Sequence, residues 1–174
     1  MAFGRLDGMS IRLFYDRWPQ YHRRLLDAVP TWSDEVLALR ASPEHMALWA
    51  IVGHIASTRV YWLCHVAGEA GAETTPFVGP YGDGWEDDPD HPRSAEELAS
   101  ALESTWSIID RVLDRWSPAD LETEVDRWYG TERQVHTKTS ILQRLISHEA
   151  YHVGEISQTL GVHGLPEVYI WRAY

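Results

Sequence analysis

The segment 141–160 constrains the fold of this chain more than any other. Its apolar residues recur at steps of three and four, the period of an α-helix; they are Leu142, Leu145, Ile156 and Leu160. His148 and His152 are four residues apart, so they project from one face of that helix, a single turn apart. Because this face lies on or beside the apolar stripe, the two imidazoles must be satisfied in the interior, either by hydrogen bonds or by a metal ion.

Four long helical segments are predicted in all. They cover approximately residues 9–29, 42–68, 94–116 and 141–160. Pro19 either kinks the first segment or begins a new helix in its own first turn. Ser42 and Pro43 are predicted to begin the second, which is apolar nearly all round and should be deeply buried. Ser94 and Glu97 form a capping box ahead of the third.

The connection 70–93 is long and rich in glycine, proline and acidic residues, which predicts irregular structure. Long loops in compact proteins are often functional or mobile. Phe77, Tyr81 and Trp85 either fold over a pocket as a lid or belong to a solvated linker, and the sequence leaves both interpretations open.

The later connections are shorter. Residues 125–138 are polar, with Gly130 as a turn, and this favours a short extended pair. Gly161 is predicted to end the last helix.

Four long helices, with no convincing alternating strands and no internal repeat, predict an all-α protein. The expected architecture is a four-helix bundle with a long irregular loop between its second and third helices, forming a single domain over residues 1–174.

Composition excludes several classes of protein. The formal net charge of -11 disfavours nucleic acid and anionic membrane surfaces as partners, because both require clustered lysine and arginine. Cys64 is the only cysteine, so no intrachain disulfide can form, and a reducing compartment is the natural inference. The N-terminal stretch lacks the features of a secretory signal, and no uncharged run reaches transmembrane length. We therefore expect a cytoplasmic protein.

His54 is the best third partner for the histidine pair. Small and polar residues around it on the second segment leave room for a site. If the second and fourth helices face each other, His54, His148 and His152 converge. Three nitrogen ligands with a water in an open position describe a catalytic divalent-metal site. Zinc or nickel suits imidazole best, and iron or manganese is a weaker candidate. The alternative is a set of core histidines hydrogen-bonded to backbone or carboxylate.

Glu149 completes an H-E-x-x-H motif, which is the signature of zincin metalloproteases. The extended metzincin motif requires glycine and histidine where this chain has Glu155 and Gln158, so a protease is disfavoured. Glu149 then either accepts a hydrogen bond from a ligand imidazole or is a charge on the helix surface.

Other residues are assigned by their spacing from the candidate ligands. Tyr61 and His65 follow His54 by seven and eleven residues, so helical spacing places them on its side, and Tyr151 is also assigned to the pocket. The remaining histidines are predicted to lie at the surface; they are His22, His45, His91, His136 and His163.

Three motifs, in this order, resemble the DinB-like superfamily, which includes YfiT-like metal-dependent hydrolases and bacterial thiol transferases. They are HIASTRVYW at 54–62, SHEAYHVGEI at 147–156 and the tail GLPEVYIW at 164–171. The resemblance implies a four-helix bundle in which His54, His148 and His152 bind a divalent metal. Two features depart from the family: 153–155 reads Val-Gly-Glu where Arg-Gly-Gln is common, and the acidic loop is an elaboration.

The resemblance implies a metal-dependent enzyme with a small-molecule substrate. Either a low-molecular-weight thiol S-transferase or a small-molecule hydrolase fits. The alternatives are a non-catalytic bundle that binds a metal or a small ligand, and a structural bundle without metal. We also expect a homodimer, from the resemblance and from the many aromatic residues that one bundle core would not bury.

Overall fold

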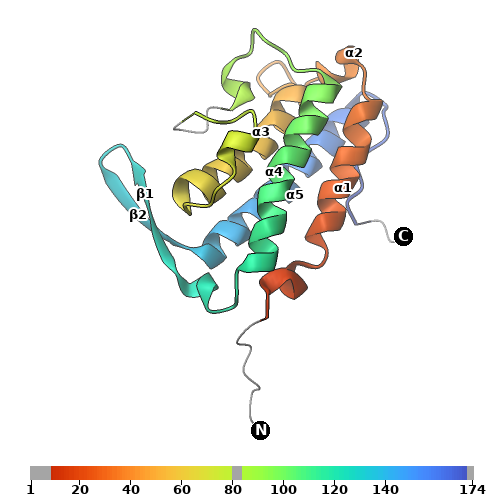
Figure 1. Cartoon of the computed structure of the whole chain (residues 1–174). Helices are drawn as coiled ribbons and strands as arrows, with labels where there is room; N and C mark the ends of the chain where they lie inside the picture. The colour runs from red at the N-terminus through yellow and green to blue at the C-terminus, as the bar shows by residue number, and fades with distance from the viewer. Residues whose placement is uncertain (1–8, 80–83, 172–174) are drawn as a thin grey trace.

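The computed structural model describes residues 9–79 and 84–171. Four longer helices lie side by side in Figure 1: α1 (Trp18–Ala28), α3 (Leu48–Val60), α4 (Ala95–Arg115) and α5 (Lys138–Val162). The helix α2 (Asp34–Leu37) is a single turn. Short 3-10 turns cover Ile11–Tyr15, Val29–Thr31, Ala72–Thr74, Trp85–Asp87 and Asp120–Glu122. The mostly helical architecture predicted from the sequence is confirmed.

A β-hairpin between α4 and α5 is the one sheet in the described residues. It pairs β1 (Glu124–Tyr129) with β2 (Glu132–Thr137) in antiparallel register, with Val125 opposite His136. Gly130 has a φ of 60°, which the turn requires and which glycine adopts without steric cost. The hairpin projects from one side of the helices in Figure 1. The extended pair anticipated at 125–138 is therefore present.

The helix α3 is at the centre of the molecule. It contacts both α4 and α5, and α1 also packs against α4 and α5. As its all-round apolar sequence predicted, it is buried on nearly every side; Leu48, Ile51, Val52, Ile55 and Val60 are all fully buried. Burying each such side chain stabilises the fold by about 1.5–3 kcal/mol before the entropy of ordering it is counted.

The start of α3 corrects the sequence prediction. The helix begins at Leu48 rather than at Ser42. The Ser42 hydroxyl instead donates a 2.6 Å hydrogen bond to the Glu44 carboxylate and lies 2.8 Å from Nδ1 of His45. A serine that bonds to its close neighbours in this way stabilises a local turn in competition with a helix. By contrast, Pro19 lies in the first turn of a new helix, and the capping box of Ser94 with Glu97 is present.

The end of α3 is a π-helix, η3 (Tyr61–Val66), which continues it without a break. A π-helix closes i→i+5 hydrogen bonds, so its wider turns change the angular position of every later residue. Positions predicted from a uniform 3.6-residue period are therefore unreliable after Val60.

The end of α5 also differs from the prediction. The helix runs past Gly161 to Val162, and Gly164, with a φ of 73°, takes the left-handed conformation just beyond it. The tail then packs back on the helices as expected: Ser157 exchanges hydrogen bonds with the backbone of Val168, and Ile170 is buried.

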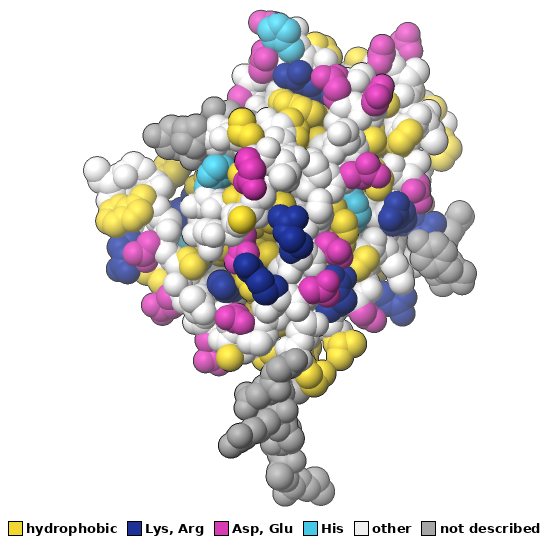
Figure 2. All heavy atoms as spheres, in the orientation of Figure 1, with side chains coloured by type: hydrophobic (Ala, Val, Ile, Leu, Met, Phe, Trp, Pro, Cys, Tyr) yellow, Lys and Arg dark blue, Asp and Glu magenta, His cyan; other side chains and the backbone are white. Residues whose placement is uncertain are grey.

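The surface carries its acidic excess without gathering it into one patch on the face shown in Figure 2. Acidic and basic side chains are interspersed there among apolar ones. No helix within 9–79 and 84–171 has the length and apolar character needed to cross a membrane.

A buried ion pair joins the longer helices. Arg59 of α3 is fully buried, and its Nε donates a 2.7 Å hydrogen bond to Glu149 of α5. The other carboxylate oxygen of Glu149 accepts a 2.8 Å hydrogen bond from the Trp18 indole of α1, while Arg59 also donates to the Leu102 carbonyl of α4. Both roles predicted for Glu149 were wrong. It lies neither at the surface nor against a ligand imidazole, because it neutralises a buried guanidinium.

His22 lies beside this pair and corrects a second prediction. It was expected at the surface, yet it is 3% exposed and stacks on Trp106 at a centroid distance of 4.4 Å. Burial, together with the neighbouring charges of Arg59 and Arg23, lowers the pKa of His22 to about 2. The imidazole is therefore neutral at pH 7 and adds no charge to the core.

Replacing Glu149 tests the importance of this pair. We expect Glu149→Ala to lower the free energy of unfolding by about 3–5 kcal/mol, because Arg59 would remain buried without a counter-charge. Denaturant unfolding measures the loss. The exposed Glu103 of α4 provides a control, and Glu103→Ala should change stability by less than about 0.5 kcal/mol. The double variant Arg59→Met with Glu149→Leu should recover much of the loss. If Glu149→Ala left the free energy of unfolding nearly unchanged, the result would contradict the assignment of Glu149 as the counter-charge of Arg59.

Candidate metal centre

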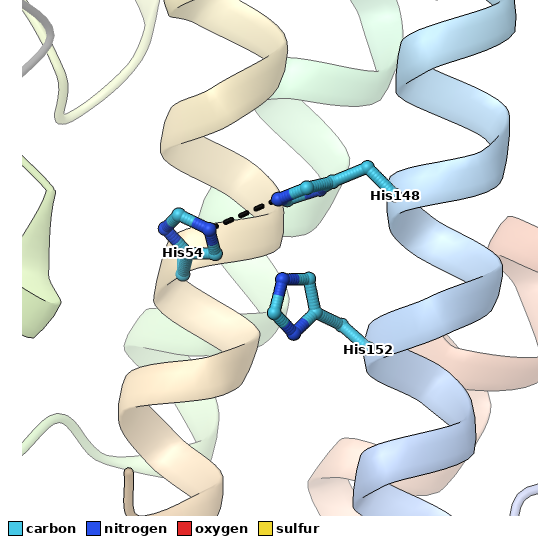
Figure 3. Close-up of side chains that lie close together, drawn as sticks. All are labelled: His54, His148 and His152. Carbon is cyan, nitrogen blue, oxygen red and sulfur yellow. Dashed lines mark hydrogen bonds between the residues drawn. The ribbon is translucent and has the colours of Figure 1, made fainter.

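Three histidines from two helices meet at one point. His54 projects from α3, and His148 and His152 project from α5 toward it (Figure 3). One ring nitrogen from each lies within 4.8 Å of the others, and the Nε2 atoms of His54 and His148 are 2.9 Å apart. Two bare nitrogen lone pairs repel at that distance, so a proton or a cation must lie between them. The convergence predicted from the sequence is confirmed.

The backbone next to His54 leaves room for another segment to pack closely against it. Gly53 precedes it, and a Cβ at that position would lie 3.2 Å from Cβ of Trp85. A larger residue there would push away the turn η5 (Trp85–Asp87), which carries Glu86. The small residue next to His54 therefore lets the 70–93 connection reach the histidines.

Two carboxylates hold the outer nitrogens of two of the imidazoles. Nδ1 of His54 is hydrogen-bonded to Glu86, and Nδ1 of His152 is hydrogen-bonded to Glu155 at 2.9 Å. A carboxylate on Nδ1 fixes the tautomer and leaves Nε2 free as a ligand. Sequence reasoning missed both carboxylates. Glu155 follows His152 by three residues and could have been found from that spacing, whereas no local spacing connects Glu86 to His54.

His148 differs from its two neighbours. Its Nδ1 is buried and has no hydrogen-bond partner in the described part of the chain. Burial first, and then the neighbouring His152, His54 and Arg144, lower the pKa of His148 to about 3. Burial also lowers the pKa of His152, against the opposing effect of Glu155. Both imidazoles are thus neutral at pH 7, which is the form that binds a metal ion.

A cavity of about 340 Å³ adjoins His54 and His148. Tyr61 and Trp62 contribute to its walls, so the assignment of Tyr61 to the pocket agrees with the structure. A wider hollow of about 880 Å³ is also lined by His148, and Tyr151 borders it while remaining 70% exposed.

His65 lines neither of these cavities in the part of the chain that the structure describes. It lies on the π-helical segment η3, where regular helical spacing no longer applies, and its ring centroid is 6.5 Å from that of Tyr61. The assignment of His65 to the pocket stays a prediction, whereas His136, which was expected to be a surface residue, borders the wider hollow.

The connection 70–93 is neither a free lid nor a solvated linker throughout. Phe77 is 1% exposed and packs on Trp85 at a centroid distance of 5.0 Å. Tyr81, the third aromatic residue expected here, lies outside the described residues. The buried Phe77 and the partly buried Trp85 anchor the segment, and Glu86 next to Trp85 is hydrogen-bonded to His54.

Comparison with known proteins agrees with this architecture. A family model of the DinB superfamily matches residues 18–156. The chain belongs to the DinB superfamily. Among solved structures, a DinB-like protein from Bacillus cereus superimposes with a TM-score of 0.69 at 20% identity, covering 95% of this chain and 99% of that one. No curated protein matches the chain. This DinB-superfamily chain therefore shares its overall fold with a protein of very different sequence.

The hydrogen-bond partners predict the tautomers of the metal-free protein. His54 and His152 should carry their protons on Nδ1, facing Glu86 and Glu155. His148 should then carry its proton on Nε2 and donate that N–H to His54. Its Nδ1 is left as a bare acceptor without a partner, which costs less than burying an N–H without an acceptor. Long-range ¹⁵N–¹H NMR on labelled histidine distinguishes the two forms at pH 7. A proton on Nδ1 of His148 would contradict this arrangement.

Proposed function

We propose that His54, His148 and His152 bind one divalent metal ion and that the chain is a metal-dependent enzyme acting on a small molecule. The observation that supports this most strongly is the convergence of three ring nitrogens, two of them from imidazoles oriented by carboxylates. Three nitrogen donors suit zinc or nickel better than iron or manganese. Membership of a superfamily that commonly binds divalent metal supports the same proposal.

The reaction that fits best is the transfer of a low-molecular-weight thiol to an electrophile, or the hydrolysis of a small substrate. A divalent ion held by three neutral imidazoles acts as a Lewis acid and lowers the pKa of a water or thiol that reaches it. The protein supplies the rest: Glu86 and Glu155 orient two imidazoles, and the adjoining cavity of about 340 Å³ admits a small substrate.

The buried state of Glu149 argues against a protease. A zincin requires the glutamate of H-E-x-x-H as its general base at the metal. Here both carboxylate oxygens of Glu149 are occupied, one by Arg59 and the other by Trp18, inside the helical core. In this chain the glutamate of the motif therefore pairs with Arg59 instead of acting as a general base.

The proposal also covers the architecture, the location and the oligomeric state of the protein. We take the four longer helices as the four-helix bundle of the family, and we propose a cytoplasmic homodimer. Exposed aromatic residues, among them Trp128, Tyr169 and Trp171, supply apolar surface for a partner copy. A non-catalytic metal or small-ligand binder is the second candidate function, because the same ligands would serve it.

Metal titration tests the first step. Calorimetry with zinc or nickel should show one ion per chain, and alanine at His54, His148 or His152 should weaken binding sharply, because one of the three ligands is lost. Glu155→Gln should weaken binding by about 10–100-fold, because the His152 ring would no longer be held by a charged acceptor. The exposed His91, which is hydrogen-bonded to Asp88, provides the control, and His91→Ala should bind as the wild type does. Unchanged affinity in His54→Ala would refute the site.

Turnover assays test the second step. The metal-loaded protein should consume a low-molecular-weight thiol in the presence of a chlorinated aromatic electrophile, or hydrolyse a small ester or amide. The metal-free protein and His148→Ala should do neither. If the fully loaded protein shows no turnover in either assay, the metal site is a binding site and the non-catalytic alternative holds.

A further inference from the structure

Two arginines border the cavity beside the histidines, and neither has a carboxylate partner among the described residues. Arg127 of β1 donates from Nε to the Tyr61 hydroxyl and from Nη1 to the Gln134 amide oxygen, both at 2.8 Å and both neutral. The side chain of Arg144 in α5 forms no hydrogen bond or ion pair with the described residues, and its guanidinium lies over the Trp62 ring at 4.7 Å. Within the described residues, these two guanidinium groups therefore have no carboxylate in direct contact.

Several arginines elsewhere in the described structure form ion pairs. Paired examples are Arg12 with Asp110 and Asp114, Arg59 with Glu149, Arg115 with Glu69, and Arg133 with Asp126. The contrast is clearest on the hairpin itself, where Arg133 is paired with Asp126 and its neighbour Arg127 is not. The net charge of -11 makes carboxylates plentiful in this chain, yet the two that border this cavity, Glu86 and Asp87, form no ion pair with either arginine in the described structure.

The two guanidinium groups share a neighbour and a cavity. Arg127 lies 5.2 Å and Arg144 4.7 Å from the centroid of the Trp62 ring, and both border the 340 Å³ cavity. Guanidinium groups also present paired N–H donors that match the oxygens of a carboxylate or a phosphate.

The cavity wall also carries two carboxylates. Glu86 and Asp87 of η5 border it, and Glu86 is hydrogen-bonded to His54. Carboxylates near His54 would repel a second negative group. The cavity is therefore suited to a molecule with a single anionic group, flanked by the aromatic walls of Tyr61 and Trp62.

We propose that Arg127 and Arg144 bind an oxyanion, either carboxylate or phosphate, carried by the small-molecule substrate of this site. The inference identifies the substrate of the proposed enzyme and to that extent rests on the proposed function, although anion binding itself requires no metal. Arg144 precedes His148 by one helical turn, so α5 presents the anion-binding group and two imidazoles on one face. An anion held there places the remainder of the molecule against the histidines.

Calorimetry on the metal-free protein tests the proposal with three matched probes: benzoate, phenyl phosphate and neutral benzamide. Benzoate or phenyl phosphate should bind saturably at millimolar concentration, and the preferred one of the two identifies the oxyanion, whereas benzamide should not bind. Arg127→Gln and Arg144→Gln should each weaken anion binding about tenfold or more, the loss expected for a hydrogen bond to a charged group. Arg133→Gln removes an equal charge from the same hairpin and should change nothing.

Several results would overturn the proposal. They are failure of both anions to bind the wild type, equal binding of benzamide, or unchanged affinity in Arg144→Gln. Arg144 is an exposed residue of α5, so that variant is expected to fold, and circular dichroism checks it. Zinc titration of the same variants separates this proposal from the metal site. Retained zinc with lost benzoate binding supports the arginine subsite, and benzoate binding without any zinc binding would refute the metal centre alone.

Discussion

The buried contact between Arg59 and Glu149 is the interaction on which the candidate site depends. It joins α3 to α5, and the Trp18 indole and the Leu102 carbonyl extend it to α1 and α4. A buried charge without its partner is strongly destabilising, so few alternative alignments of these two helices are tolerated. The same two helices carry His54 and His148. The contact that fixes the alignment of α3 and α5 in the core therefore also brings the imidazoles together at the edge of the core.

Adjacent residues of one motif serve these two purposes. His148 and Glu149 project about 100° apart around α5. The glutamate turns into the core and neutralises Arg59, while the histidines one turn apart face His54. The carboxylates that orient the imidazoles come instead from Glu155 and from Glu86 in the 70–93 connection. An H-E-x-x-H pattern on a helix thus contributes to stability and to the site through different side chains.

Sequence periodicity predicted much of this structure because the long helices bury regular apolar stripes. It predicted that α3 is deeply buried, that Ser94 and Glu97 cap α4, and that three histidines meet. It failed where the local geometry departs from a regular helix, at the turn around Ser42. It also failed where long-range contacts determine a role, as for His22, Glu86 and Glu149, since no local spacing reveals a partner many residues away.

X-ray absorption spectroscopy at the metal edge, on protein loaded with one equivalent of zinc or nickel, tests the central claim most directly. Three imidazole nitrogens should appear in the coordination shell of the wild type, and the count should fall to two in His54→Ala, the variant that changes only α3. A shell without imidazole, or one that is the same with and without His54, would contradict a metal site shared between α3 and α5.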